Sequence, residues 1–320
     1  MSAKKRLTKK QRKKLLGLAL ALVVIAAAGI MTLAGGDISP LVEAFPALGE
    51  LFPQEAEIPV SLPAEGHLRV HFIDVGQGDC VLIQGPEKTL MMDGGEAEYG
   101  AAIVEYLQSQ GVERIDYYVN THPHADHYGG IQEVMEAIPT GAFCPGPIPE
   151  DIFPTTRGYE RLLDYLEESG TEVRLLQPGD TLDLGGGGVL TILGPVAEYS
   201  DLNNISLVSR LDFGESSFLF CGDAETGPEE DLLEAGAYLS ADVWMVPHHG
   251  SSTGADPDFL AAVDPSYAVI SVGQDNDYGH PHEEMLELLA QGEITVLRTD
   301  LRGTVVFDAD GTDLTVSTQR

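Results

Sequence analysis

The segment NTHPHADHYGG (120–130) constrains the fold of this chain more strongly than any other feature, because it concentrates four potential metal ligands within six positions. These ligands are His122, His124, Asp126 and His127. The segment continues from IDYYVN, which predicts a β-strand. Alternating positions in an extended loop point His122 and His124 the same way, while Asp126 and His127 can face a second point nearby. Imidazole and carboxylate groups suit zinc, manganese or iron, and the segment therefore predicts a metal site.

Further His and Asp residues also stand directly after predicted strands. They are Asp223 in FLFCGDAE, His248 and His249 in VWMVPHHGSSTG, and His280 and His282 in DYGHPHEEM. Seven of the nine histidines thus fall in three strand-to-loop junctions, where sheet proteins build their active sites. Unrelated surface histidines are the alternative, but they have no reason to collect at equivalent positions. His67 and His71 stand outside these junctions, and no site role is predicted for them.

The rest of the pattern mixes strands with helices. Strands are predicted at 68–75, 80–84, 89–92, 115–120, 172–176, 205–213, 217–221, 241–246, 267–272, 294–298, 303–308 and 313–317. Helices are predicted at 99–111, 129–138, 157–169, 256–263 and 282–290. The glycine run at 185–188 predicts the tip of a hairpin. Because hairpins occur together with crossover helices, the pattern predicts two sheets in a layered α/β sandwich.

The charge of the chain is strongly acidic and unevenly distributed. It has 51 Asp and Glu residues against 18 Lys and Arg, and eight of those cations lie in the first fourteen residues. The other 306 residues hold 10 cations against 51 acids, a net charge of −41. Such a body repels polyanions at long range. If the substrate is a phosphate ester, metal ions must supply the local positive charge.

The N-terminal region predicts a membrane anchor. Residues 15–34, LLGLALALVVIAAAGIMTLA, carry no charge, and twenty helical residues span about 30 Å, which matches the hydrocarbon core of a bilayer. The preceding basic residues predict a cytoplasmic tail at 1–14 and an extracellular location for everything after the anchor. A cleaved signal peptide, which would leave a secreted protein, is the alternative. A Pro-rich linker is predicted at 35–66 and a globular domain at 67–320.

Six sequence blocks carry a resemblance to a known family. They are HFIDVGQGDCVLI, LMMDGG, HPHADHYGG, NNISLVSRLDFGESSFLFCGD, VPHHGSS and ISVGQDNDYGHPH. In this order they resemble the metallo-hydrolase domain at the C-terminal end of ComEC-type competence proteins, which have the metallo-β-lactamase fold and act in DNA uptake. The resemblance runs from about residue 67 to residue 317. Full ComEC proteins also contain a channel of many spans and an oligonucleotide-binding-like domain. Here one anchor helix is expected in their place, which leaves a role in uptake open.

The resemblance implies an αββα sandwich with two metal positions. The first would be held by His122, His124 and Asp223, and the second by Asp126, His127, Asp223 and His249. Many members of the fold place another histidine before the bridging aspartate, where this chain reads DLNNISLV with Asn204 nearest, so the first position lacks a ligand. Asp93 of LMMDGG resembles a carboxylate that orients a ligating histidine, and a turn residue before two glycines is an equal alternative. Asp79 of GQGD has the same two interpretations.

These features support the hypothesis of metal-assisted phosphodiester hydrolysis by two zinc or manganese ions that activate a water molecule. In this interpretation Asp223 bridges the ions, and His248 contacts the phosphate or protonates the leaving oxygen. His280 is expected to contact the substrate, and Asn204 belongs to the catalytic set at the position of the missing ligand. His282 is expected either to contact the substrate or only to begin a helix.

The sequence leaves the substrate open. Single-stranded DNA is the specific expectation, but nucleic-acid affinity normally depends on Lys and Arg, and the acidic body offers no basic track. A small cell-surface phosphodiester, such as phosphorylcholine or teichoic acid, is a second possibility within the same fold. A non-catalytic, membrane-tethered binding module is a third. A β-lactamase is not favoured, since the flanking blocks match the ComEC-type branch of the fold. The sequence does not indicate a protein partner.

Overall fold

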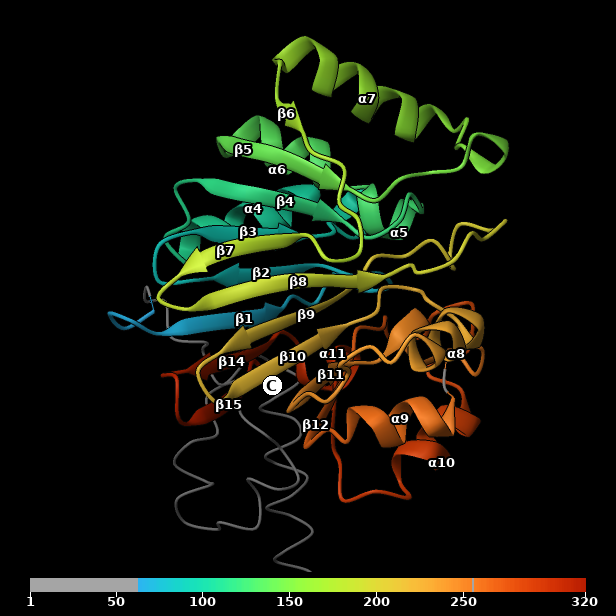
Figure 1. Cartoon of the computed structure of the whole chain (residues 1–320). Coiled ribbons are helices and arrows are strands. Elements are labelled where there is room, and N and C mark those ends of the chain that lie inside the picture. The colour runs from blue at the N-terminus through green and yellow to red at the C-terminus, as the bar shows by residue number, and fades with distance from the viewer. Residues whose placement is uncertain (1–62, 255) are drawn as a thin grey trace, which may run out of the picture. The chain divides into compact units, whose positions relative to one another are not determined.

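The computed structural model describes residues 63–254 and 256–320, which form two β-sheets packed face to face (Figure 1). In spatial order, the eight-stranded sheet contains β15 (Leu314–Thr318), β14 (Val305–Ala309), β1 (Leu68–Phe72), β2 (Val81–Gln84), β3 (Thr89–Met92), β4 (Ile115–Asn120), β5 (Thr140–Pro145) and β6 (Glu172–Val173). The seven-stranded sheet contains β13 (Thr295–Arg298), β12 (Tyr267–Ile270), β11 (Val243–Met245), β10 (Ser216–Phe220), β9 (Val208–Phe213), β8 (Gly188–Gly194) and β7 (Thr181–Gly185).

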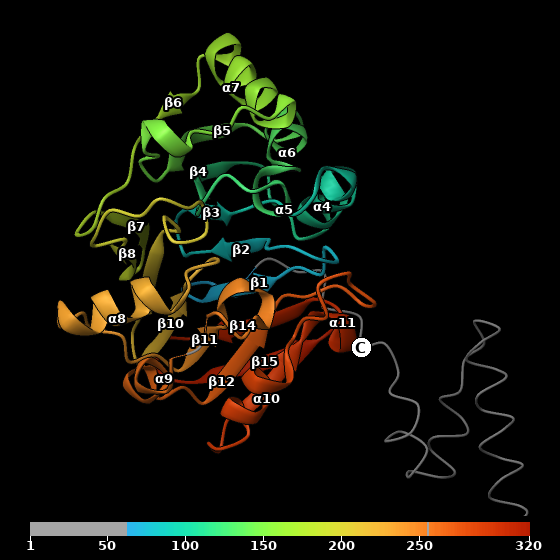
Figure 2. The ribbon, with the colours of Figure 1, turned by 90° about the vertical axis from the view of Figure 1, so that its right-hand side faces the viewer.

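Helices cover the outer face of each sheet, as Figure 2 shows. The eight-stranded sheet carries α4 (Gly100–Ser109), α5 (Ala125–Tyr128), α6 (Ile131–Ala137) and α7 (Arg157–Ser169). The seven-stranded sheet carries α8 (Thr226–Glu234), α9 (Pro257–Val263) and α10 (Glu283–Leu289). The remaining short elements are α11 (Thr299–Arg302) and the 3-10 turns η1 (Ala97–Tyr99), η2 (Glu150–Ile152) and η3 (Pro247–Gly250). The described residues therefore form four layers in the order helix, sheet, sheet, helix.

The central strands, such as β2 and β10, are buried on both sides because each sheet is covered on both faces. In β1, Val70 and Phe72 face the space between the sheets, where the Phe72 ring lies 6.1 Å from that of Phe220 across the interface. Leu82 of β2 belongs instead to the cluster under α4 and α6, together with Ile103. All three hydrophobic clusters consist of buried side chains, and close packing makes such a frame rigid. Loops at the strand ends are thereby held in fixed positions.

Parallel strand pairs bring the histidine-bearing junctions to neighbouring edges. Strands β3, β4 and β5 run parallel in one sheet, and β10, β11, β12 and β13 run parallel in the other. The ends of parallel strands meet at one edge of a sheet. The two edges are joined by a hydrogen bond, in which the backbone N–H of Leu207 donates to the carbonyl of Thr121 at 3.0 Å. Loops that follow β4, β10, β11 and β12 can therefore converge on one place.

The predicted two-sheet sandwich is confirmed, and most predicted elements lie within a few residues of the observed ones. Strand β5 and helix α8 were not predicted. The anchor predicted at 15–34, and nearly all of the linker predicted at 35–66, lie outside the described residues. Among residues 63–254 and 256–320, none of the helices has the length and apolar character needed to cross a bilayer.

Candidate metal centre

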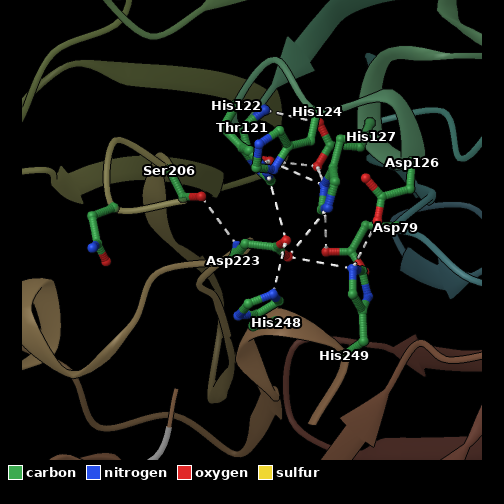
Figure 3. Close-up of polar contacts among 12 residues, drawn as sticks. Asp79, Thr121, His122, His124, Asp126, His127, Ser206, Asp223, His248 and His249 are labelled. Atoms are coloured by element: carbon green, nitrogen blue, oxygen red, sulfur yellow. Dashed lines mark hydrogen bonds and ion pairs between the residues drawn. The ribbon is translucent and has the colours of Figure 1, made fainter. Parts of the chain in front are cut away.

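Four loops supply the residues of the site, and each loop follows a strand. Figure 3 shows the side chains of His122, His127, His248 and His249 around that of Asp223, which follows β10. The loop after β4, including the first turn of α5, supplies His122, His124, Asp126 and His127. Turn η3 after β11 supplies His248 and His249, and the loop after β12 supplies His280. His124 and His280, which are 156 positions apart in the sequence, thus line the same pocket.

The first group of ligand atoms comes from Asp126, His127, Asp223 and His249, whose atoms all lie within 4.8 Å of one another. The Asp223 Oδ1 atom is 3.2 Å from His127 Nε2 and 3.5 Å from His249 Nε2, and His249 Nε2 is 3.3 Å from Asp126 Oδ2. Ligand bonds of about 2.0–2.1 Å in a tetrahedron separate the ligand atoms by roughly 3.3 Å. These three separations are close to that value, as expected of atoms that could share one cation.

The second group comes from His122, His124 and Asp223. Here the other oxygen of the carboxylate, Asp223 Oδ2, lies 3.6 Å from His122 Nε2. His122 Nε2 is in turn 3.0 Å from His124 Nδ1. Because Asp223 directs one oxygen to each group, it occupies the position of a bridging carboxylate. The second group contains three protein atoms where the first contains four.

Several buried atoms at this point lack a hydrogen-bond partner, which tests whether metal ions fit. They are His127 Nε2, His249 Nε2 and Asp223 Oδ1. Buried polar atoms are normally paired, so three unpaired atoms facing one another need an explanation. A divalent cation among them satisfies all three as ligands, and the donor set of imidazole and carboxylate suits such an ion. The residues of the first group therefore fit a divalent cation, and the donor set of the second group is of the same kind.

The electrostatics of the groups agree with this fit. Burial alone would raise the pKa of Asp223, but His127, His249 and His122 hold it well below the ordinary value. Burial alone would lower the pKa of His127, but the carboxylates of Asp223 and Asp93 raise it well above the ordinary value. Without a metal ion, protons on imidazoles thus balance the buried carboxylate charge. A cation bound between these groups would replace those protons.

Asp93 lies behind the ligands and is completely buried. Its carboxylate contacts His127 Nδ1 at 2.9 Å and accepts hydrogen bonds from the backbone N–H and the hydroxyl of Thr121 and from the amide of Asn120. This arrangement fixes which nitrogen of His127 faces Asp223, as expected of a carboxylate that orients a ligating histidine. Of the two interpretations of Asp93, the structure favours this one.

Asp79 has a related position, next to the ligand residue His249. Its carboxylate lies 3.4 Å from His249 Nδ1, and the same nitrogen is 3.0 Å from the carbonyl oxygen of Ser271. The preceding residue, Gly78, has φ +127°, and a Cβ there would lie 2.3 Å from the carbonyl oxygen of Asp126. The GQGD turn therefore contacts the backbone of the potential ligand Asp126, which explains why Gly78 is a glycine.

His248 lies beside the ligand groups without belonging to either of them. Its Nδ1 atom is 3.1 Å from the hydroxyl of Thr253, and its Nε2 atom is 3.9 Å from Asp223 Oδ2. Both His248 and His249 have left-handed backbone conformations, with φ of 50° and 55°. This conformation is costly for residues other than glycine and clusters at functional sites. It directs the two adjacent imidazoles to different parts of the centre.

Asn204 is the predicted site residue that the geometry does not support. Its side-chain amide donates to Asp201, and its carbonyl oxygen accepts from the backbone N–H of Glu225. The neighbouring Asn203 lines the site pocket instead, and its Oδ1 atom is buried without a hydrogen-bond partner. His282 begins α10 and bonds the backbone of Ser252, which agrees with the simpler of its two expected roles.

A pocket of about 320 Å³ opens onto the centre. The ligand groups supply four of its lining residues, and the others include Gln77, Asn203, His248, Tyr278 and His280. Burial, together with the neighbouring histidines, lowers the pKa of His280 to about 4. Gln77, Asn203 and Tyr278 were missed at the sequence level, although all three stand inside the blocks that carry the resemblance. This volume suits a small ligand or one segment of a larger one.

Comparisons with known proteins identify the family. The chain is 28% identical to ComE operon protein 3 of Bacillus subtilis over 271 residues, covering 77% of this chain and 33% of that protein. It is 33% identical to competence protein ComA of Neisseria gonorrhoeae, covering 78% of this chain and 33% of that protein. The chain thus spans about a third of the length of these curated relatives, which confirm the resemblance to ComEC-type competence proteins.

The fold agrees with this relationship. The metallo-beta-lactamase fold protein YhfI from Bacillus subtilis superposes with a TM-score of 0.50 at 13% identity, covering 76% of this chain and 100% of that structure. At such low identity the likeness concerns the fold alone. The family model of the metallo-beta-lactamase superfamily matches residues 73–274, which include every ligand of both groups. The chain is a member of the metallo-beta-lactamase superfamily.

Proposed function

We propose that this chain is a metal-dependent hydrolase of phosphodiesters. The observation that carries the proposal is the shared carboxylate of Asp223, whose two oxygens face two separate groups of ligand atoms at the base of one pocket. A pair of bridged cations is the arrangement that many phosphate-ester hydrolases use for in-line displacement. Zinc and manganese are both compatible with a donor set of imidazole and carboxylate.

The residues of the chain have distinct roles in this proposal. His122, His124 and Asp223 would hold one cation, and Asp126, His127, Asp223 and His249 would hold the other. The bound cations supply Lewis acidity and an activated water molecule. Asp93 keeps Nε2 of His127 directed at its cation by accepting from Nδ1.

His248 is suited to proton transfer in this scheme. Thr253 fixes its ring through Nδ1, which leaves Nε2 free to face the substrate beside Asp223. Nε2 can therefore donate a hydrogen bond to the phosphate or a proton to the leaving oxygen. His280 lines the same pocket and contacts the group attached to the phosphate.

Single-stranded DNA is the substrate that the competence relatives favour, since the resemblance links this domain to DNA uptake. A second candidate, a small cell-surface phosphodiester such as phosphorylcholine or teichoic acid, is favoured by a specific observation. No Lys or Arg of the described residues lines the pocket, so the site offers no cationic side chain to a polymeric backbone.

We further propose that residues 15–34 anchor the chain in the membrane with the catalytic domain outside the cell. Protease treatment of intact cells tests this location.

The decisive experiment is an activity panel of metals against substrates. Full-length protein with zinc or manganese is assayed on single-stranded DNA and on a small chromogenic diester, beside Asp223→Ala. We expect metal-dependent turnover that Asp223→Ala lowers by more than about a hundredfold, because the variant removes a ligand from both groups. The matched control is Asp164→Ala, which changes an exposed carboxylate of α7 far from the site in sequence and should retain activity.

Each outcome of the panel separates the candidates. Cleavage of the diester without cleavage of DNA supports the surface-ester function and contradicts the nuclease function. A protein with no bound metal, no rise in Tm on adding zinc or manganese and no turnover supports a tethered binding module.

A further inference from the structure

An exposed aromatic ring stands at the mouth of the site pocket. Tyr278 is 66% exposed, yet it lines the same pocket as Asp223 and His249. One face of its ring stacks on His280, with centroids 5.6 Å apart and planes 22° from parallel. His280 in turn lies 6.3 Å from the His249 ring. A line of rings therefore leads from solvent to the ligand groups, and it leaves Tyr278 available to another planar group.

The backbone around Tyr278 is held firmly although the side chain is exposed. The side-chain oxygen of Asn276 accepts hydrogen bonds from the backbone N–H groups of Tyr278 and His280. The amide of Asn276 donates to the carbonyl oxygens of Gly273 and His280. His282 Nε2 lies 3.3 Å from the carbonyl oxygen of Tyr278. A ring whose backbone is fixed in advance loses less entropy when a ligand stacks on it.

The charges around the pocket leave few other ways to hold a nucleic acid. The described cations that pair with acids lie elsewhere, as Arg114 does with Asp116, Arg210 with Asp212 and Arg298 with Asp300. Among the described residues, the pocket lining contains carboxylates and histidines and no Lys or Arg. Proteins that bind single strands without sequence preference combine cationic contacts with aromatic stacking. Where the cationic part is absent, stacking must contribute a larger share of the affinity.

We propose that the Tyr278–His280 pair is a stacking platform for the nucleobase next to the scissile phosphate, so that the preferred substrate is a nucleoside-flanked phosphodiester. This inference rests on the proposed phosphodiesterase function and names its substrate class. The pocket of about 320 Å³ accommodates the phosphate and one flanking group, with the base against the outer face of Tyr278. Because every base has a π-face, the platform accepts all four bases.

The test compares two dinucleotides that differ only in their bases. One is thymidylyl-thymidine, and the other has the same sugar–phosphate backbone with abasic sites. Tyr278→Ala in the full chain should lower kcat/KM for the thymidine dinucleotide roughly 5- to 150-fold, mainly through KM, because base–aromatic stacking has about that strength. It should change kcat/KM for the abasic dinucleotide less than about twofold, and Tyr278→Phe should retain wild-type values. The control Tyr238→Ala removes an equally exposed tyrosine at 69% exposure and should affect neither substrate.

A second measurement does not depend on turnover. A phosphorothioate-linked dinucleotide that contains 2-aminopurine loses fluorescence when its base stacks on an aromatic ring. Wild-type protein and Tyr278→Phe should quench it saturably, and Tyr278→Ala should not. If the wild type cleaves neither dinucleotide, the phosphodiesterase proposal fails while the fluorescence still decides on the platform. Equal losses on both dinucleotides, or undiminished quenching by Tyr278→Ala, would overturn the platform.

Discussion

At the scale of single residues, Asp93 illustrates how a buried carboxylate organises a site that it does not enter. It accepts from three protein donors while facing Nδ1 of His127, and its own backbone is left-handed with φ 56°. Each of its neighbours therefore fixes the carboxylate, and the carboxylate fixes His127. The position of the ligand depends on a network that lies one layer deeper than the pocket.

The first prediction concerns Asp93→Asn. An amide in this place has only one oxygen, so its NH2 group must face either the backbone N–H of Thr121 or Nδ1 of His127, and one contact between two donors results. We expect zinc affinity and hydrolysis to fall about 10- to 100-fold, as for other changes behind a ligating histidine. Competitive titration with a chromogenic chelator measures the affinity, and Asp164→Asn on exposed α7 is the matched control. Unchanged affinity would show that His127 needs no such partner.

The sequence predicted the ligand-bearing junctions but not the finer placement of single side chains. The histidine spacing is a local property. It identifies His122, His124, Asp126 and His127 as ligands without knowledge of the exact end of the strand. Whether Asp93 turns toward His127 depends on contacts across 34 positions, which spacing cannot show. Asn203 and Asn204 are identical side chains in adjacent positions, and only the folded backbone decides that Asn203 lines the pocket while Asn204 bonds Asp201 and Glu225.

At the scale of elements, helix α8 connects two of the three site loops that follow strands of the seven-stranded sheet, namely the loops after β10 and β11. It begins just after Asp223, and the backbone N–H of Thr226 donates to the carbonyl of Thr253. Glu229 on its buried face accepts from the backbone N–H of Asp256 at 2.8 Å, and its other oxygen has no hydrogen-bond partner. This helix thus holds the segment that follows His248 and His249.

The second prediction is a pH dependence of stability that originates at Glu229. Burial raises the pKa of this carboxyl from 4.5 to about 8 in the folded chain. Between pH 4.5 and 8 the folded state therefore binds a proton that the unfolded state has released, so the free energy of unfolding falls as pH rises. Above pH 8 the loss is complete. It amounts to a few kcal/mol at most, because each pH interval of one between the two pKa values contributes about 1.4 kcal/mol.

Glu229→Gln isolates this contribution because glutamine can accept the same hydrogen bond without ionising. The variant should gain stability over wild type as pH rises from 4.5 to 8, as measured by urea unfolding at several pH values. Glu234→Gln, at the exposed end of the same helix, should show no such trend. A constant difference between Glu229→Gln and wild type across this range would contradict a buried neutral acid.

Strand β5 and helix α8 were not predicted for related physical reasons. Helix α8 begins TGPEEDLLE, where glycine and proline usually indicate a turn, yet proline is also tolerated in the first turn of a helix. Strand β5, TGAFCP, has glycine and proline near its ends and no alternation of polar and apolar residues, because both of its faces are covered. Strands with clear patterns, such as β4, were predicted at their observed bounds.

At the scale of the whole chain, the dominant property is its acidity, with a net charge of −33. The eight cations of the first fourteen residues contrast with the −41 of the rest, so the globular part approaches any polyanion against a repulsive field. Proteins with a basic track lose affinity for DNA as salt rises, because binding releases counterions. For this chain the long-range electrostatic interaction with DNA is repulsive, so added salt should strengthen binding.

The last prediction follows from that sign. Raising NaCl from about 0.01 M to 0.15 M shortens the Debye length from roughly 30 Å to 8 Å, and so screens the repulsion between the acidic chain and a long strand. We expect kcat/KM for single-stranded DNA to rise over this range, while kcat/KM for a dinucleotide with a single phosphate changes little. Replacing the eight N-terminal cations by glutamine should preserve or strengthen the rise, since it removes the one attractive segment. A rate that falls with salt in this variant would mean that the globular part binds the strand through a basic surface. Stacking on Tyr278 would then not be needed to explain the affinity for DNA.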